Sequence, residues 1–144
     1  MIATKRGKEA VRREAKTFAR IMWETWAPAG WFTETEFEAT MSSFENPDWA
    51  DVTLHSYQVR WGEAAKDPRY RALDERVHAA KTIAVPTLMI QGGADGVTLA
   101  ASTAGKDRYF TGGYHRHVLD GVGHFPTREA AQMVNKLLLE FLAK

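Results

Sequence analysis

Only two segments of this chain have the pattern of β-strands, and both lie in its second half. Val85–Asp95 (VPTLMIQGGAD) reads as a buried strand that ends at an acid, and a second strand is expected over His115–Leu119. The continuous apolar run in the first of them is typical of a parallel strand that is covered on both faces. Two strands make a poor sheet, so the pattern predicts an incomplete parallel sheet with open edges.

The part of the chain before residue 80 shows only helical patterns. Apolar residues recur at helical spacing over 15–26. Further helix starts are marked by a capping box and by two pairs of an N-cap residue and a proline: Thr33-x-x-Glu36, Asn46-Pro47 and Asp67-Pro68. We expect the helix after Pro47 to run to about Trp61, and the last one to carry Leu73 and Val77 on its apolar side. The sequence therefore predicts a helical lobe over residues 1–80 and an α/β segment over 81–144.

Two helices are expected to accompany the strands, a short one near Leu99–Ala104 and a longer one over Pro126–Leu142. The longer helix has a wide apolar stripe that must pack on the sheet: Met133, Val134, Leu137, Leu138 and Phe141. Two strands cover such a stripe only in part. The open sheet edge and the stripe are therefore expected to drive association, by self-pairing or with a separate segment that completes the sheet.

Each strand is followed by a glycine-rich turn that carries one ionisable residue, Asp95 after the first and His124 after the second. The carboxyl ends of parallel strands meet at one crevice, so both side chains can reach the same place. There an acid can hold an imidazole in the productive tautomer, and the imidazole can activate a hydroxyl group or water. Read alone, each residue has an alternative explanation of equal weight: Asp95 as a turn-forming aspartate, and His124 as a helix-capping or core-edge histidine.

Together these motifs resemble the carboxyl-terminal portion of the α/β-hydrolase fold, over Val85–Lys144. That fold pairs a strand ending in Gly-x-x-Asp with a Gly-x-x-His turn before the final helix. Gly92–Asp95 matches the first pattern and Gly121–His124 the second. The acid precedes the histidine, as in the family order of nucleophile, acid and histidine. The resemblance implies an α/β chain, namely a helical cap lobe followed by the last βαβα portion of the hydrolase sheet. It also implies that Asp95 is the triad acid and His124 the base.

The helical lobe is similar to the cap domain that many α/β-hydrolases insert before the acid strand. Its segment 54–61 (LHSYQVRW) resembles the caps of the epoxide hydrolase and haloalkane dehalogenase branch, although Gln58 stands where an arginine is often found. In that branch a cap tyrosine or tryptophan donates a hydrogen bond to an epoxide oxygen or a leaving halide. The resemblance thus implies Tyr57 as the substrate-binding donor, with His55 and Trp61 as weaker candidates. Alternatively, Tyr57 and Trp61 are simply core residues at helical spacing.

The sequence contains no nucleophile for such a triad. None of its four serines lies in Gly-x-Ser-x-Gly, and no Gly-x-Asp-x-Gly elbow or oxyanion-hole loop is present. We therefore expect the carboxyl-terminal part of a hydrolase for a small ester, epoxide or halogenated substrate, nearly inactive on its own. The alternatives are a non-catalytic remnant or binding module, and one chain of a split hydrolase.

The amino-acid composition limits the classes of partner and of site that we expect for this chain. The net charge of +1 gives no electrostatic reason to expect nucleic acid or a charged membrane as partner. The absence of cysteine excludes disulfides and thiolate sites, and the five histidines form no HExxH motif. His115 and His117 share a strand face, which is weak evidence for a metal. We expect a soluble cytoplasmic chain that binds a small-molecule substrate and needs neither a cofactor nor a metal.

Overall fold

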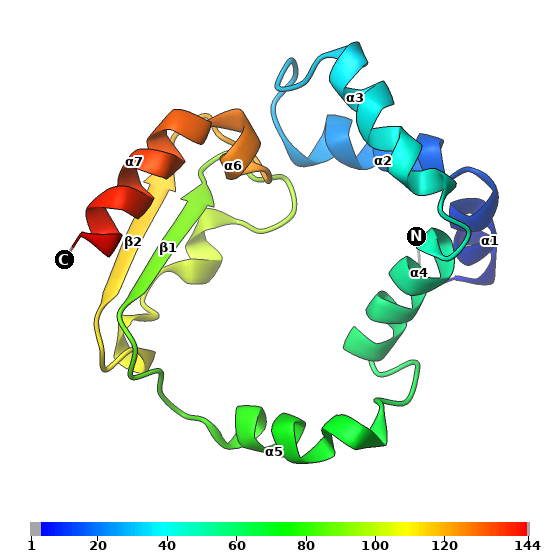
Figure 1. Cartoon of the computed structure of the whole chain (residues 1–144). Helices are drawn as coiled ribbons and strands as arrows, with labels where there is room; N and C mark the ends of the chain where they lie inside the picture. The colour runs from blue at the N-terminus through cyan, green and yellow to red at the C-terminus, as the bar shows by residue number, and fades with distance from the viewer. Residues whose placement is uncertain (1–3, 144) are drawn as a thin grey trace. The chain divides into compact units, whose positions relative to one another are not determined.

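The computed structural model of the chain describes residues 4–143 (Figure 1). These residues form two compact units. The first, called the helical unit below, comprises the chain up to Met22 together with Thr33–Ala79. The second, the sheet unit, comprises Trp23–Phe32 and the chain from Ala80 onward. The sequence-based division near residue 80 differs from these units in one segment, because Trp23–Phe32 packs with the sheet and not with the helices.

The helical unit contains short helices joined by tight turns. In chain order these are α1 (Lys5–Arg13), α2 (Ala15–Trp26, whose last turn belongs to the sheet unit), α3 (Glu34–Met41), the 3-10 turn η1 (Ser42–Glu45), α4 (Trp49–Arg60), η2 (Pro68–Tyr70) and α5 (Arg71–Ala79). Within residues 4–143 no helix is both long and apolar enough to cross a bilayer.

Local capping explains where several of these helices begin. The Thr33 hydroxyl accepts a hydrogen bond from the Glu36 amide at 3.2 Å, which confirms the start of α3. Asp67 accepts one from the Arg69 amide at 2.9 Å and begins η2. Asn46 instead accepts from the Asp48 amide, so α4 starts later than the expected Pro47.

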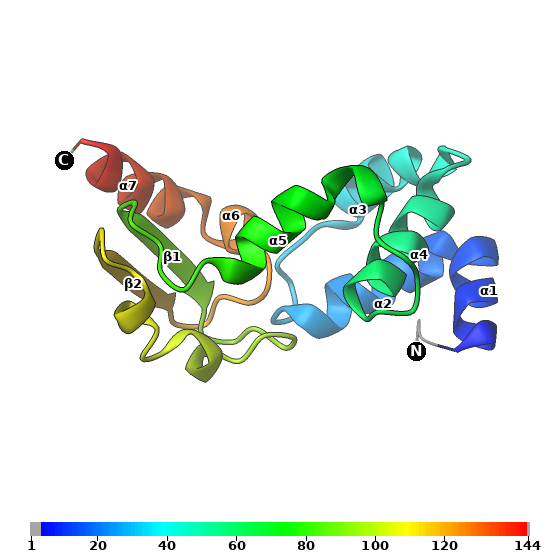
Figure 2. The same ribbon diagram turned by 90° about the horizontal axis from the view of Figure 1, so that it is seen from below.

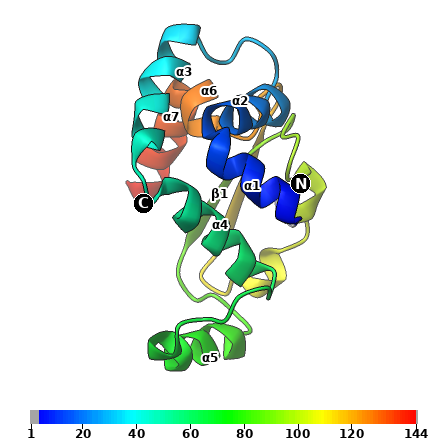
Figure 3. The same cartoon turned by 90° about the vertical axis from the view of Figure 1, so that its right-hand side faces the viewer.

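The core of the helical unit lies between α1 and α4, which run side by side in Figure 3. Val11 and Leu54 are each 1% exposed, and partly buried side chains pack around them: Phe18, Trp49, Ala50 and Tyr57. Full burial of such an aliphatic side chain contributes about 2 kcal/mol. The expected apolar side of α5 is not buried, since Leu73 and Val77 are more than half exposed.

The sheet unit contains the two expected strands, β1 (Thr87–Gly92) and β2 (Tyr114–Leu119), paired in parallel from Thr87↔Tyr114 to Gly92↔Leu119. The prediction of an incomplete parallel sheet is confirmed. Full coverage of β1 is not found in the described residues, because only its last two residues, Gln91 and Gly92, are buried.

Helices lie on both sides of this small sheet (Figure 2). The crossover from β1 to β2 carries η3 (Ala100–Thr103) and η4 (Asp107–Tyr109) on one side, and α6 (Pro126–Glu129) and α7 (Ala131–Leu142) lie on the other. The single helix expected over Pro126–Leu142 is broken at Ala130, whose φ of −136° is not helical. Val134 of α7 is buried whereas Met133 is 48% exposed, so the apolar stripe is only partly covered.

Candidate active site

Two turns at the carboxyl ends of the strands bring Asp95 and His124 together. Asp95 lies just beyond β1, and His124 lies between β2 and α6. Nδ1 of His124 is 2.9 Å from Oδ2 and 3.0 Å from Oδ1 of Asp95. The side chains that the sequence placed at one crevice are therefore within hydrogen-bonding distance.

The Asp95 carboxylate is fixed by the backbone that follows it. Its Oδ1 accepts hydrogen bonds from the amides of Val97 at 2.7 Å and Thr98 at 2.9 Å. The side chain is 7% exposed. Burial alone raises the pKa of this carboxyl, but the amides of Thr98 and Val97 and the His124 ring outweigh it and hold the pKa below its usual value. Asp95 is therefore an anion at neutral pH.

The orientation of the His124 imidazole follows from this partner. An ionised carboxylate only accepts hydrogen bonds, so Nδ1 carries the proton that it shares with Asp95. No residue of the described chain forms a hydrogen bond with Nε2, and the side chain is 29% exposed. This tautomer leaves the Nε2 lone pair free to accept a proton, as a general base requires.

Three consecutive amides fix the backbone of the histidine turn. The Glu129 carboxylate accepts from Gly123 at 2.5 Å and from Phe125 at 2.8 Å. Between them, the His124 amide donates to the carbonyl oxygen of Trp26 at 3.1 Å. Sequence reasoning missed both acceptors. The sequence holds a local signal for Glu129, an acid in the first turn of a helix, where it can accept hydrogen bonds from amides that lack a partner within the helix. It holds no such signal for Trp26.

Aromatic rings of the Trp23–Phe32 segment pack beside the histidine turn. The Trp26 ring lies edge-to-face with His124, with centroids 4.9 Å apart, and Trp31 stacks on Phe125 at 4.6 Å. These contacts join segments that are far apart in the sequence, so no local pattern could predict them.

A partly buried polar network supports the loop that holds Asp95. Gln91, 4% exposed, donates from Nε2 to the Thr98 carbonyl at 2.7 Å. Its Oε1 accepts from the Thr103 hydroxyl at 2.5 Å, and that hydroxyl accepts from Nε of Arg116 at 2.8 Å. The network fixes Thr98, whose amide binds Asp95.

The three other sequence candidates lie in the helical unit, His55 and Tyr57 on α4 and Trp61 directly after its last residue. Tyr57 packs against the Val11–Leu54 core and contacts the Trp61 ring at 5.2 Å, which agrees with the core alternative for it. Trp61 is 48% exposed, and His55 lines a cavity of about 680 Å³ within this unit. The structure thus brings Asp95 and His124 together in the sheet unit and leaves these three in the helical unit.

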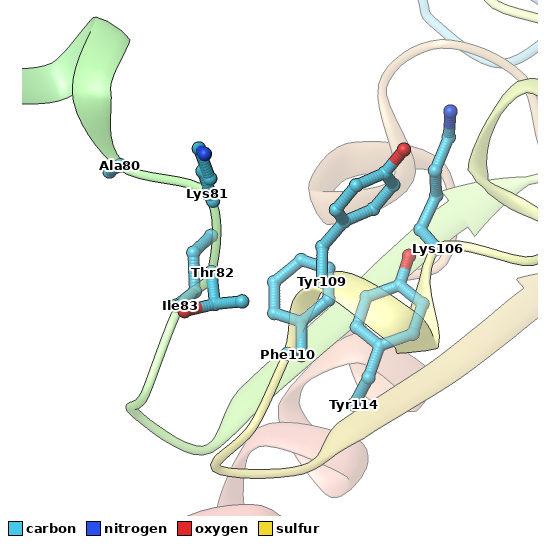
Figure 4. A pocket seen from close by; sticks show the side chains of 8 residues that line it. All are labelled: Ala80, Lys81, Thr82, Ile83, Lys106, Tyr109, Phe110 and Tyr114. Atoms are coloured by element: carbon cyan, nitrogen blue, oxygen red, sulfur yellow. The ribbon is translucent and has the colours of Figure 1, made fainter.

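A second cavity of about 700 Å³ lies at the other end of the strands (Figure 4). Its lining residues come from the segment before β1 and from the η4–β2 connection: Ala80, Lys81, Thr82, Ile83, Lys106, Tyr109, Phe110 and Tyr114. None of them is a carboxylate or a histidine, so this cavity holds no carboxylate–histidine pair like that of Asp95 and His124. The part of the chain described also contains no cluster of three or more histidine, aspartate or glutamate side chains that could hold a metal ion.

No protein-family model matches this chain. Among curated proteins, Epoxide hydrolase A of Mycobacterium tuberculosis is 41% identical to it over 64 residues, which are 44% of this chain and 20% of that protein. The chain thus spans about a fifth of this curated relative.

Two solved structures extend the similarity to nearly the whole chain. One is a Klebsiella pneumoniae protein provisionally assigned as an epoxide hydrolase, with a TM-score of 0.87 and 29% identity over 97% of this chain and 46% of its own. The other is a mutant epoxide hydrolase of Bacillus megaterium in complex with its naphthyloxy-propanediol product. Its TM-score is 0.67 at 19% identity, over 99% of this chain and 49% of its own, so it shows the fold alone. The chain has the architecture of a cap and a partial α/β-hydrolase core. It spans about half the length of these two structures.

Proposed function

We propose that this chain, which corresponds to the cap and carboxyl-terminal core of an epoxide hydrolase-like α/β-hydrolase, supplies the acid and the base of a hydrolase active site. The observation that carries the proposal is the pair of distances of 2.9 and 3.0 Å between His124 Nδ1 and the Asp95 carboxylate. Its epoxide hydrolase relatives favour an epoxide as substrate, with a small ester or a halogenated compound as the other candidates.

In this proposal Asp95 orients the imidazole and stabilises its charged form. Nε2 of His124 takes a proton from a water molecule as that water attacks the covalent intermediate. In the branch that the cap resembles, this intermediate is an ester between the substrate and an aspartate nucleophile. Attack on its carbonyl releases the diol and restores the aspartate, and the imidazolium returns its proton to the leaving oxygen.

The nucleophile must come from a segment outside the given sequence. The serines of the helical unit, Ser42, Ser43 and Ser56, donate to carbonyl oxygens within their own helical turns. Ser102 lies in η3 on the crossover, away from any strand-to-helix elbow. We therefore expect this chain by itself to be nearly inactive. The alternative is a non-catalytic binding module. Mutation of His124 separates the two: loss of turnover favours the hydrolase, whereas loss of binding alone favours the binding module.

The missing segment is also the partner that we propose for the sheet. The amides of Thr87 and Gly93 point toward β2. They donate to the carbonyl oxygens of Gly113, directly before β2, and of Leu119, its last residue. Because the direction alternates along a strand, the backbone groups of Leu88 and Ile90 point to the opposite, open edge. A further parallel strand can pair there, and in its absence two copies of this chain can associate. A chain that elutes as a monomer at all concentrations in size-exclusion chromatography contradicts self-association.

On α4 we propose Tyr57 as the donor to the epoxide oxygen, with His55 and Trp61 as weaker pocket residues. The support is the cap resemblance of the segment 54–61. No described residue forms a hydrogen bond with the Tyr57 hydroxyl, so donation to a substrate would break no bond seen in the described chain.

A complementation experiment tests the function. This chain is co-expressed with the part of the Klebsiella pneumoniae relative that it does not cover, since it covers 46% of that protein. We expect hydrolysis of a small aryl epoxide to the diol, dependent on both halves. Replacement of His124 by Gln should abolish diol formation, while the matched change His78→Gln, at an exposed histidine of α5, should not. Diol formation that survives His124→Gln contradicts the proposal.

A further inference from the structure

We propose that Trp26 is a positioning residue for His124, through its backbone carbonyl and through its ring. The proposal rests on the base role of His124 for its functional meaning. Trp26 lies at the end of α2, in the Trp23–Phe32 segment that packs with the sheet unit.

The Trp26 carbonyl oxygen connects the two loops of the site. It accepts one hydrogen bond from the amide of Gly96 at 3.2 Å and another from the amide of His124 at 3.1 Å. Gly96 directly follows Asp95, so one oxygen binds both the acid loop and the histidine turn. This places the two backbones at a fixed separation from each other.

Two glycines make this close approach feasible. A Cβ atom on Gly96 would lie 2.5 Å from the carbonyl oxygen of Thr25, and one on Gly123 would lie 2.4 Å from Cα of Ala27. Both distances are far below van der Waals contact, and in each case the opposing atom belongs to the backbone. Any larger residue at either position must therefore displace the 25–27 backbone from the site.

The Trp26 ring restrains the imidazole directly. Its centroid lies 4.9 Å from that of His124 at an interplanar angle of 78°, and it is nearly parallel to Phe125 at 6.2 Å. Asp95 holds the imidazole only at Nδ1, so the ring is free to rotate unless its faces are also occupied. The Trp26 contact restricts this rotation and keeps Nδ1 directed at the carboxylate.

A neighbouring tryptophan separates this role from ordinary core packing. Trp31 belongs to the same aromatic group, where it stacks on Phe125 and donates its indole N–H to the Trp23 carbonyl at 2.8 Å. None of its ring contacts includes His124. Of the two indole rings, only that of Trp26 contacts the imidazole in the described part of the chain. Besides Trp26, His124 contacts the ring of Phe125, edge-to-face at 5.3 Å.

The test is hydrogen exchange of the His124 Nδ1 proton, followed by NMR on the full chain labelled with ¹⁵N. We expect Trp26→Leu to accelerate this exchange by about tenfold or more, because the imidazole leaves the carboxylate more often. Trp26→Phe, which keeps an aromatic contact, and Trp31→Leu should each stay within about twofold of the original chain. Equal acceleration by Trp26→Leu and Trp31→Leu would mean that only general packing matters, and it overturns the proposal.

Gly96→Ala keeps the test decisive if Trp26→Leu fails to fold. It displaces the Trp26 carbonyl without changing either side chain, and we expect the same acceleration. Its control is Gly93→Ala, where a Cβ would lie 3.2 Å from the Leu119 carbonyl oxygen and needs only a small adjustment. Unchanged Nδ1 exchange in Gly96→Ala refutes the proposal. An intact Nδ1 signal in a complemented protein without hydrolase activity would refute the proposed function and leave the positioning role standing.

Discussion

The sheet unit and the helical unit hold their charged side chains in different ways. In the sheet unit, Asp95 and Glu129 each accept hydrogen bonds from two backbone amides, and Asp95 also binds His124. In the helical unit, the pairs Arg12–Asp51 and Lys16–Glu38 join exposed side chains on helix surfaces. Exposed pairs contribute at most about 1 kcal/mol and exchange easily with water, whereas backbone amides have fixed positions.

The comparison indicates where the chain needs accurate geometry. A proton can be transferred only if donor and acceptor stay within hydrogen-bond distance, so a dyad held by backbone amides suits catalysis. Ion pairs between flexible side chains can tolerate movement of the helices that carry them. The accuracy of this chain is therefore concentrated in the turns after β1 and β2.

The largest expected effect concerns activity. In the complemented hydrolase, Asp95→Asn should lower kcat about ten-thousandfold, because the amide can donate to Nδ1 and favours the wrong imidazole tautomer. Glu38→Gln, which removes an exposed ion pair of the helical unit, should leave kcat within about twofold. Diol formation measured for both variants tests whether accurate geometry matters more at the dyad of the sheet unit than at the exposed ion pairs of the helical unit. Similar losses in both variants contradict this.

The next effect concerns stability at the histidine turn. Gly123→Ala places a methyl group 2.4 Å from Cα of Ala27. We expect it to lower the free energy of unfolding by about 3 kcal/mol, because neither backbone can move without breaking the hydrogen bonds that the amides of the turn donate. Gly93→Ala, with its nearest atom at 3.2 Å, should cost about 1 kcal/mol or less. Urea unfolding followed by tryptophan fluorescence measures both, and equal losses would show that the turn is not tightly packed.

The dependence of stability on pH gives a smaller effect. The pKa of Asp95 is lower in the folded chain than in the unfolded chain. Its ionised form therefore stabilises the fold fully above the unfolded value of about 3.9, and the contribution disappears as pH falls through the lowered folded value. The difference in unfolding free energy between the original chain and Asp95→Asn should shrink as the pH falls below about 4. A difference that persists at the lowest pH contradicts the amide-bound carboxylate.

The smallest expected effect concerns α4. Tyr57→Phe should change the free energy of unfolding by less than about 0.5 kcal/mol, because its hydroxyl makes no hydrogen bond with the described residues while its ring packs on the core. In the complemented hydrolase the same variant should lower kcat by at least about tenfold if Tyr57 donates to the epoxide oxygen. A large stability loss with unchanged kcat would assign Tyr57 to the core alone.

The sequence predicted what depends on local pattern. The apolar run before Asp95 and the glycine turn before His124 predicted the two parallel strands and the proximity of the two side chains, because the carboxyl ends of neighbouring parallel strands must meet. The two-stranded sheet and the capped start of α3 were also predictable. The strands and the start of α3 are determined by residues within a few positions of one another. The proximity of Asp95 and His124, which are 29 positions apart, follows from the general geometry of parallel strands.

Contacts between distant segments, beyond those that follow from the pairing of the two strands, could not be predicted. The Trp23–Phe32 segment continues a regular helical pattern from Ala15, so nothing local separates Trp26 from the helical lobe. The break at Ala130 was missed because that residue favours a helix and only its surroundings force it to leave one. The exposed apolar side of α5 is visible only once the neighbours of the helix are known.

The most direct test of the dyad is the tautomeric state of His124 in this chain by itself. A two-dimensional ¹H–¹⁵N spectrum of the imidazole at neutral pH distinguishes a protonated Nδ1 from a protonated Nε2. We expect Nδ1 to carry the proton, with a slowly exchanging signal that disappears in Asp95→Asn. A proton on Nε2, or a signal that is the same in Asp95→Asn, would contradict a preformed pair of Asp95 and His124.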